Sequence, residues 1–414
     1  MYAEFTARDG IYRLVQEQGY TLSWTRESGV ELIQEDGLFF KDLERAGTLL
    51  PYEDWRLTPW ERAQDLARRL TIGEIAGLML YSPHQMVPPR AGGPFPGTYD
   101  GKPYEEANVP AHALTDQQKR FMEREHIRHI LMVAVEDAAT AARWTNELQK
   151  RAERLPHGIP VNLSSDPRSG ARNTGAEFKS AGGDVSKWPE GVGFAACFDP
   201  GVVRQFAQDA SREYRALGIT TALGPQIDLC TEPRWMRFVD TLGENVEMTK
   251  KLVRAYCDGM QTTEGAPGGW GRDSVNTMVK HWPGGGTGEG GRDAHYAFGA
   301  YAVYPTQNAA EHEKPFTEAA FKLDGPTRCA AAVMPYYTVS WGLDPKGVGN
   351  SYSEVLIKDR LRGECGYQGV VCTDWGITKD PSPDMDAFAS RCYGVETLSE
   401  AERCLTAILN GVDQ

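Results

Sequence analysis

Long hydrophobic runs, paired cysteines and an excess of basic residues are all missing from this sequence. The longest clean apolar run, Ile130 to Val135, is far too short to span a bilayer. None of the eight cysteines belongs to a CxxC pair, so nothing indicates a zinc ribbon or a thioredoxin-type site. The formal net charge of −13 argues against general nucleic-acid binding and against docking on anionic lipid.

No signal peptide is visible either, because the first ten residues have neither a basic segment nor an apolar one. We therefore expect a reduced chain in the cytoplasm, or a secreted or periplasmic chain if a signal has been removed. What is present is ordinary globular composition, with 24% charged and 41% hydrophobic residues. The 414 residues suffice for one large barrel-type domain or for two ordinary domains.

The chain divides by pattern at about residue 60. Residues 1–60 are mixed, and Asp36-Gly37 turns between short hydrophobic stretches, which predicts a hairpin or an extended arm. In residues 61–414, short apolar runs alternate with amphipathic stretches of helical period. The predicted strands are 77–80, 127–133, 159–163, 219–223, 275–280, 329–334 and 369–373. The predicted helices include 137–154, a helix opening at Asp199-Pro200, 351–362 and 396–409.

This alternation predicts parallel β/α architecture. Seven strands precede the end, and Gly411 to Gln414 has the pattern of an eighth strand that has only begun. We therefore predict a (β/α)8 TIM-type barrel that stops at the start of its eighth strand, with a doubly wound open sheet as the competitor. Because the first and seventh strands would have unpaired edges, we expect this chain not to act alone.

Polar and aromatic residues follow five of the predicted strands, where chemistry gathers in parallel β/α proteins. They include the carboxylates Asp166 and Asp374, several bases, a histidine and aromatics. A carbohydrate needs this mixture, because its hydroxyls take bidentate hydrogen bonds while its apolar faces pack on aromatic rings. The groups lie in Ser164–Asp166, in GPQIDLCTEPRWMR with Asp228, Arg234, Trp235 and Arg237, in Lys280–Pro283, in Met334–Tyr337 and in Thr373–Gly376.

Each of these residues also has a structural interpretation. Asp374 could cap a following helix, and Tyr337 and Trp375 could be core aromatics. Arg234 and Arg237 could form ion pairs on the surface. We favour the functional interpretation because all of them fall at the same end of successive strands. The glycine stretch 286–291 matches GxGxxG, but no amphipathic helix follows it, so a nucleotide site is not predicted. His126 and His129 are interpreted as surface or structural residues.

Several segments together carry a family resemblance. LTIGEIAGLML, GIPVNLSSD, KWPEGVGFAACFDP, PQIDLCTEPRWMRF, KHWPGGG and GVVCTDWG occur in this order from about residue 50 onward. The chain thereby resembles glycoside hydrolase family three, in particular its β-glucosidase-like members. The resemblance implies an exo-acting retaining glycosidase that removes a β-linked sugar, most simply glucose, from the non-reducing end of a glycoside or oligosaccharide. Such chemistry needs neither a metal nor an organic cofactor.

The resemblance also implies residue roles. Asp374 would be the nucleophile that forms the covalent glycosyl-enzyme, in a retaining pair whose carboxyl groups lie about 5–5.5 Å apart. The sugar would be bound by Asp166, Arg237, Lys280, His281, Tyr337 and Trp375. Met236 replaces the usual glycine of the arginine motif, and Tyr336 stays open as an alternative to Tyr337.

The general acid is the open part of the assignment. In β-glucosidase-like members it is a glutamate on a second, α/β-sandwich domain, which we expect a C-terminal fragment or second subunit to supply. A barrel-only branch, the β-N-acetylhexosaminidases, uses an Asp–His pair that Asp293 and His295 imitate at a different spacing; the structural interpretation of this pair is favoured. The alternatives are therefore a glycosidase completed by another segment, a catalytically incomplete sugar-binding barrel, or a hexosaminidase that uses Asp293 and His295.

Overall fold

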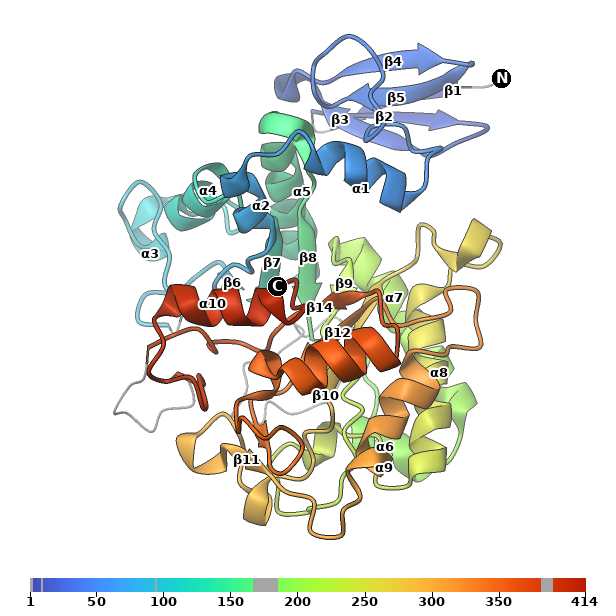
Figure 1. Ribbon diagram of the computed structural model, residues 1–414. Helices are drawn as coiled ribbons and strands as arrows, with labels where there is room; N and C mark the ends of the chain where they lie inside the picture. The colour runs from blue at the N-terminus through green and yellow to red at the C-terminus, as the bar shows by residue number, and fades with distance from the viewer. Residues whose placement is uncertain (1–2, 9, 94, 167–184, 381–389) are drawn as a thin grey trace. The chain divides into compact units, whose positions relative to one another are not determined.

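A computed structural model describes residues 3–8, 10–93, 95–166, 185–380 and 390–414 of the chain (Figure 1). The chain folds as two compact units, residues 1–163 and 164–414. The division predicted from the sequence, into residues 1–60 and 61–414, stays a prediction.

The first unit begins with five antiparallel strands. The turn between the last two has positive φ at both Asp36 (50°) and Gly37 (77°), which a two-residue type I′ hairpin requires. The predicted hairpin at this dipeptide is therefore confirmed, and the segment before it is a second sheet rather than an arm. The strands are β1 (Ala3–Arg8), β2 (Ile11–Gln16) and β3 (Leu22–Thr25) in one sheet and β4 (Glu31–Glu35) and β5 (Leu38–Asp42) in the other.

The rest of the first unit is α/β. Its helices are α1 (Pro59–Ala67), α2 (Ile72–Leu78), α3 (Tyr104–Ala107), α4 (Asp116–Glu123) and α5 (Ala138–Arg154). The strand predicted at 77–80 is wrong, because α2 occupies this region. Thr71 and Glu74 form a capping box that starts this helix: each side chain accepts a hydrogen bond from the other residue's backbone N–H. The strand lies farther along, as β6 (Gln85–Val87), and pairs in parallel with β7 (His129–Val135).

The second unit contains the remaining parallel strands and their helices. The strands are β8 (Asn162–Ser165), whose first residues belong to the other unit, β9 (Thr221–Ala222), β10 (Asn276–Trp282), β12 (Ala332–Pro335) and β14 (Val370–Val371), with the small pair β11 (Tyr301–Ala302) and β13 (Val339–Ser340). The helices are α6 (Gly191–Cys197), α7 (Pro200–Leu217), α8 (Val246–Gln261), α9 (Ala309–Lys314), α10 (Glu400–Leu409) and two π-helical segments, Pro315–Ala320 and Glu354–Glu364.

The chain thus has an α/β fold with a seven-stranded parallel sheet in the order β14-β12-β10-β9-β8-β7-β6. Six of the seven predicted strands are confirmed, with bounds shifted by up to three residues. The interior strand β10 is buried along all but its first residue, as both faces of a parallel sheet are covered. The helix predicted over 351–362 lies in the π-helical segment from Glu354, and the others are confirmed as α5, α7 and α10.

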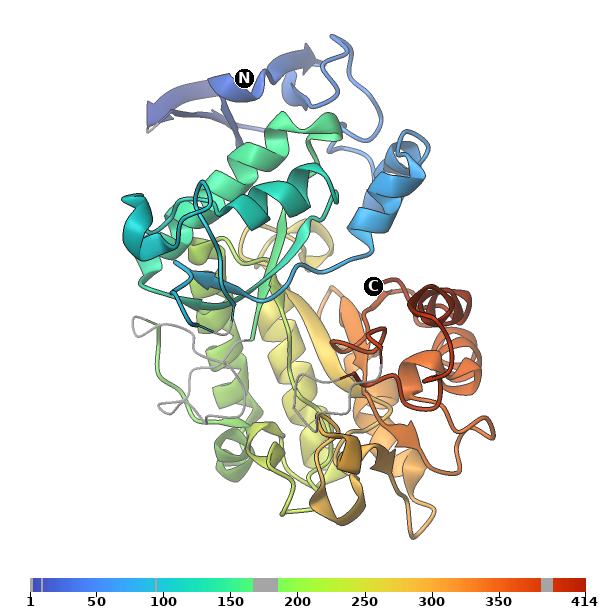
Figure 2. The same ribbon diagram turned by 90° about the vertical axis from the view of Figure 1, so that its left-hand side faces the viewer.

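Helices α7 and α8 lie side by side in both views (Figures 1 and 2). Their approach depends on Gly259 of α8, where a Cβ atom would come within 2.7 Å of the Ala207 Cβ and 2.9 Å of the Arg204 carbonyl oxygen. A side chain at this position would therefore push the two helices apart.

The last residues of the sequence run along β14. The Asp413 N–H donates to the Val371 carbonyl (2.9 Å), and the Thr373 N–H donates to the Gln414 carbonyl (2.7 Å). These bonds are of the kind that a neighbouring strand would make, in the place where an eighth strand is predicted. None of the described helices is long and apolar enough to cross a membrane.

Candidate active site

The residues predicted to form the site all lie in the second unit, at the carboxyl ends of its parallel strands. Asp166 directly follows β8, Lys280 and His281 lie near the end of β10, Tyr337 follows β12, and Asp374 follows β14. The strand order places β10 between β8 and β14. The fold therefore sets Lys280 and His281 between the two carboxylates.

Lys280 and Asp166 form an ion pair at one side of the site. The Lys280 Nζ donates to Asp166 Oδ1 at 2.8 Å, and the lysine is only 6% exposed. Because a largely buried cation is matched by one carboxylate, the pair presents both a donor and an acceptor to a neighbouring ligand. Such a combination suits adjacent hydroxyl groups.

His281 is held by Asp228, a fully buried residue that sequence reasoning grouped with the strand ends but gave no role. Asp228 accepts hydrogen bonds from the His281 backbone N–H (3.0 Å) and from the Gly285 N–H (2.5 Å). Its Oδ2 lies 2.7 Å from His281 Nδ1. Burial raises the pKa of Asp228 to about 6, although the backbone hydrogen bonds and the charges of Arg237 and Lys280 oppose this effect.

Arg237 fixes the tautomer of the same histidine. Its Nη1 lies 3.1 Å from His281 Nε2, and a guanidinium can only donate. Nε2 therefore accepts in this contact, and Nδ1 carries the proton that Asp228 accepts. Arg237 is 4% exposed. Burial lowers the pKa of its guanidinium, but the neighbouring groups Tyr336, Asp293 and Asp374 raise this pKa by more. The guanidinium therefore stays charged.

Asp374 lies at the centre of the site. Its Oδ1 accepts a hydrogen bond from the Tyr337 hydroxyl (2.6 Å) and another from the Trp375 backbone N–H (2.9 Å). Its buried Oδ2 has no hydrogen-bond partner among the described residues, and His281 Nε2 lies 3.8 Å from it. Asp374 thus has one oxygen held in place and one left for a reacting atom.

The electrostatic surroundings of Asp374 favour its ionised form. Burial raises the pKa of this carboxyl group, whereas His281, His295, Arg237 and the Tyr337 hydrogen bond lower it. The lowering effects prevail, and the pKa of Asp374 lies below its usual value. A buried carboxylate that stays ionised is what a nucleophile requires.

Of the two neighbouring tyrosines, Tyr337 makes the contact with Asp374. The Tyr336 ring packs instead on His281, with centroids 4.5 Å apart, and its hydroxyl lies 3.4 Å from Asp293. Both are 1% exposed, and burial raises the pKa of each phenol well above its usual value. Tyr337 therefore stays protonated and donates.

Arg391 belongs to the site and was missed by sequence reasoning. Its guanidinium lies 4.6 Å from the Tyr337 ring centroid, and its Nη1 donates to the Trp375 carbonyl at 2.9 Å. It thereby connects the phenol that holds Asp374 to the residue that follows Asp374. No local motif around Arg391 signals this role, because the contact arises only from the folded chain.

Asp293 and His295 form a tight pair near this centre. His295 Nδ1 lies 2.5 Å from Asp293 Oδ1, and the His295 ring packs edge-on against Tyr337 with centroids 5.1 Å apart. Asp293 also accepts from the Trp235 indole at 2.7 Å. Burial raises the pKa of Asp293, but His295 and Arg237 lower it well below its usual value; burial lowers the pKa of His295.

Other candidate residues lie apart from this cluster. Arg234 pairs on the surface with Glu232 (2.7 Å), and Met236 is exposed. The glycine stretch forms a short 3-10 turn, Glu289–Gly291, and not the start of an α-helix.

His129 contacts Asn162 at 3.0 Å, and burial lowers the pKa of His129 to about 4. Across the described ranges, no group of three or more His, Cys, Asp or Glu could hold a metal ion.

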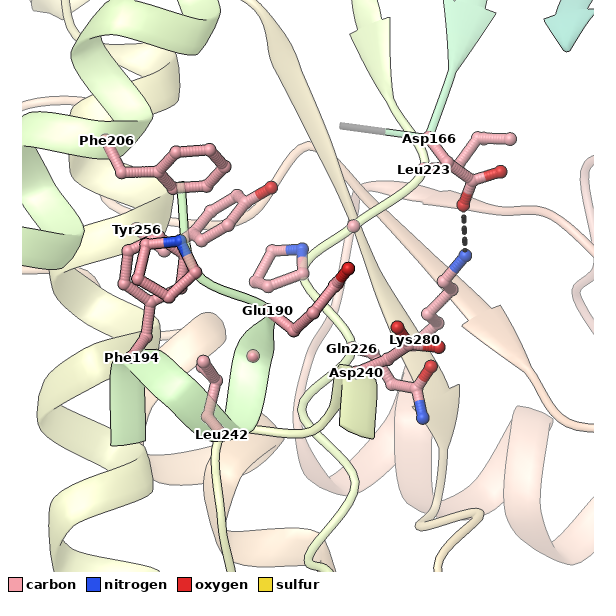
Figure 3. Close-up of a pocket in the computed structure, with 14 residues that line it drawn as sticks. Asp166, Glu190, Phe194, Phe206, Leu223, Gln226, Asp240, Leu242, Tyr256 and Lys280 are labelled. Atoms are coloured by element: carbon pink, nitrogen blue, oxygen red, sulfur yellow. Dashed lines mark hydrogen bonds and ion pairs between the residues drawn. The ribbon is translucent and has the colours of Figure 1, made fainter. Parts of the chain in front are cut away.

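A pocket of about 530 Å³ adjoins the ion pair of Asp166 and Lys280 (Figure 3). Phe194, Phe206 and Tyr256 supply an aromatic wall, and Glu190 at the start of α6 points into the space. The polar lining is rich in acceptors and has one cation: Asp166, Glu190, Gln226, Asp240 and Lys280. The pocket therefore favours a ligand that carries many donors and some apolar surface, as a sugar does.

The N-terminal domain of glycosyl hydrolase family 3 matches residues 99–413. A "Periplasmic beta-glucosidase/beta-xylosidase" of Dickeya chrysanthemi is 40% identical over 400 residues, which cover 93% of this chain and 57% of that protein. A "Beta-glucosidase C" of Emericella nidulans is 36% identical over 375 residues, covering 90% and 56%. The chain spans little more than half the length of these curated relatives.

Solved structures show the same fold. A β-glucosidase from Erythrobacter marinus superposes with a TM-score of 0.60 at 25% identity, covering 87% of this chain and 41% of that one. A family 3 β-N-acetylglucosaminidase from Paenibacillus gives a TM-score of 0.61 at 23% identity, covering 83% and 54%.

Proposed function

Because the chain belongs to glycosyl hydrolase family 3, we propose that it is the barrel part of a β-glucosidase-like enzyme with Asp374 as nucleophile. The observation that carries this proposal is the state of Asp374: ionised, buried, fixed through Oδ1 and open at Oδ2. The proposal includes a (β/α)8 barrel completed by an eighth strand alongside β14.

The proposed reaction hydrolyses a β-glycoside with retention. Asp374 Oδ2 attacks the anomeric carbon and forms an ester bond while the bond to the leaving oxygen breaks and that oxygen takes a proton. Water then attacks the same carbon, loses a proton to the acid/base group, and releases the carboxylate. Arg237 supports the negative charge of Asp374, and Tyr337 fixes its direction of attack.

The sugar is proposed to lie between Asp374 and the Asp166–Lys280 pair. Two observations support this placement: the strand order sets β10 between β8 and β14, and Asp166 and Lys280 line the acceptor-rich pocket. Hydroxyl groups remote from the anomeric carbon then reach Asp166 and Lys280, while Trp375 walls the site. The names of the relatives indicate β-glucosides and β-xylosides as the substrates to test first.

The deciding experiment is chemical rescue of Asp374→Ala by azide. Azide entering from the nucleophile's face gives a glycosyl azide of inverted configuration, whereas rescue of an acid/base variant gives the retained one, because azide then attacks the glycosyl-enzyme. Nuclear magnetic resonance of the product distinguishes them. A retained product from Asp374→Ala would refute the assignment.

A hexosaminidase is the second candidate, and the tight pairing of Asp293 with His295 beside Tyr337 favours it. In that reaction His295 would deliver the proton to the leaving oxygen. His295→Ala should then slow substrates with poor leaving groups far more than nitrophenyl glycosides, which need little protonation. Equal slowing of both would leave the pair a structural role.

Two further tests address completeness and location. Binding of a sugar by residues 1–414 without turnover would favour the catalytically incomplete sugar-binding barrel. Hydrolysis that returns on addition of a C-terminal fragment or second subunit would instead favour the glycosidase completed by another segment. The cytoplasmic location expected from the sequence stays a prediction, which cell fractionation tests; the Dickeya relative is named as periplasmic.

A further inference from the structure

The N-terminal strands carry two aromatic rings stacked across neighbouring strands. Tyr12 on β2 and Trp24 on β3 are register partners, with ring centroids 5.7 Å apart and an angle of 26° between the ring planes. Both side chains are half-buried. The two rings therefore form a partly exposed apolar surface, the Tyr12–Trp24 surface, that a ligand can reach.

Trp24 lies between two hollows. One, of about 740 Å³, is lined by both rings together with Arg26 and Glu31. The other, of about 500 Å³, lies between β3 and α5 and is lined by Trp24, Lys41 and Asn146 among others. A ligand several rings long can therefore follow the surface past Trp24.

The second hollow has a rigid floor. Lys41 forms a close ion pair with Glu153 of α5 and donates to the Ser23 carbonyl at 2.9 Å. The Glu153 carboxylate also accepts from the Thr25 N–H at 3.2 Å. Because these contacts join β3, β5 and α5, the hollow keeps its shape without a ligand.

Several polar groups around the rings have no partner among the residues that the structure describes. They are the Trp24 indole N–H, the Arg26 guanidinium, the Glu31 carboxylate and the Asn146 amide. They supply donors and acceptors in similar measure, and the charges of Arg26 and Glu31 cancel. The surface therefore suits a neutral ligand rich in hydroxyl groups more than an anion or a cation.

We propose that the Tyr12–Trp24 surface binds a pyranoside chain of an oligosaccharide or polysaccharide, at a site separate from Asp374. The apolar C–H faces of consecutive sugar rings pack on the aromatic rings, and their hydroxyls bond to Arg26, Glu31 and Asn146. Arg26 and Glu31 lie outside the part of the chain that matches the family domain, which begins at residue 99, whereas Asn146 lies within it. The site would hold substrate chains near the enzyme whether or not hydrolysis follows.

The test is native electrophoresis in gels that contain soluble mixed-linkage β-glucan or xylan. The chain carries Asp374→Asn so that the polysaccharide is not digested. We expect polysaccharide to slow this protein, and Trp24→Ala to abolish the slowing. The matched control is Trp60→Ala, because Trp60 is a 72% exposed tryptophan on α1 that lines neither hollow.

Arg26→Ala and Asn146→Ala keep the test valid if Trp24→Ala does not fold. Both residues are exposed, and each should weaken binding about fivefold, the equivalent of one hydrogen bond. In the active enzyme these variants should leave kcat/KM on aryl glycosides unchanged. Unaltered slowing of a folded Trp24→Ala variant, or no slowing of the parent by either polysaccharide, would overturn the proposal. If the gel shows slowing that depends on Trp24 but the chain with its native Asp374 has no glycosidase activity, the result would support this binding site. It would then refute only the proposed function.

Discussion

Tyr337 donates a hydrogen bond of 2.6 Å to Asp374, and this bond reaches the oxygen that does not face His281. The phenol thereby leaves Oδ2 as the oxygen that we propose to react. Because a hydrogen bond to the ionised form lowers the pKa of a carboxyl group, it also helps to keep Asp374 charged.

Replacement of Tyr337 by Phe should therefore raise the pKa of Asp374. Activity needs the carboxylate, so the acidic limb of the kcat/KM profile should move to higher pH. Loss of one hydrogen bond to a charged group should lower kcat about 10- to 100-fold at neutral pH. Steady-state kinetics between pH 4 and pH 8 measure both effects. Tyr336→Phe is the matched control, and an acidic limb that moves equally in both variants would contradict this role.

Asp374→Asn should abolish turnover while the fold stays intact, because the amide keeps the shape of the side chain but cannot attack the anomeric carbon. We expect kcat to fall by at least about 10³-fold. Circular dichroism and thermal unfolding should match the parent. Substantial residual hydrolysis with unchanged stereochemistry would show that another residue is the nucleophile.

Lys280→Ala should mainly weaken sugar binding, since it removes a charged donor rather than the reacting group. It also leaves Asp166 without the partner at 2.8 Å, so KM should rise at least about tenfold. Lys346→Ala provides the control, because Lys346 lies on the surface in an ion pair with Glu354. An unchanged KM for Lys280→Ala would place the sugar elsewhere.

Asp228 gives a prediction for the pH dependence of stability. Its pKa is raised to about 6 in the folded protein from 3.8, so the folded state holds its proton more tightly than the unfolded state does. Its contribution to stability is therefore complete below about pH 4 and is lost as the pH rises toward 6. Asp228→Asn removes this loss. The melting temperature of the variant minus that of the parent should therefore become more positive as the pH rises from 4 to 7. A constant difference across this range would contradict the prediction.

The same substitution should also disturb the histidine. Asp228→Asn places an amide where the carboxylate accepts from His281 Nδ1, so we expect the ring to lose the tautomer in which Nε2 accepts from Arg237. Nuclear magnetic resonance of ring nitrogens reports the tautomer directly and separates this effect from the change in stability.

Most of the site could be predicted because its residues follow strands in short local motifs. Asp166, Lys280 and Asp374 each come at the end of an apolar run, and parallel topology brings such ends together. The roles of Arg391 and Asp228 could not be predicted in the same way. Both act through contacts that only the folded chain creates, with Tyr337 and His281 respectively.

The fold shows the same division. Apolar runs located six parallel strands, but the run at 77–80 belongs to a helix, because a capping box at Thr71 and Glu74 starts α2 just before it. Only the β4–β5 hairpin of the five N-terminal strands could be predicted, because the Asp36-Gly37 turn is a local signal. The pairing of β2 with β1 and β3 has no such local signal.

The eight thiols of this chain differ in a way that has practical use. Cys197 is the exposed one, and it ends α6, the helix that begins next to Glu190 at the pocket beside Lys280. A thiol-reactive fluorophore should therefore attach selectively at this position, since reagents reach exposed cysteines first. The chain thus contains its own labelling point, and a change in emission on addition of a sugar would report binding at this pocket without any engineered cysteine.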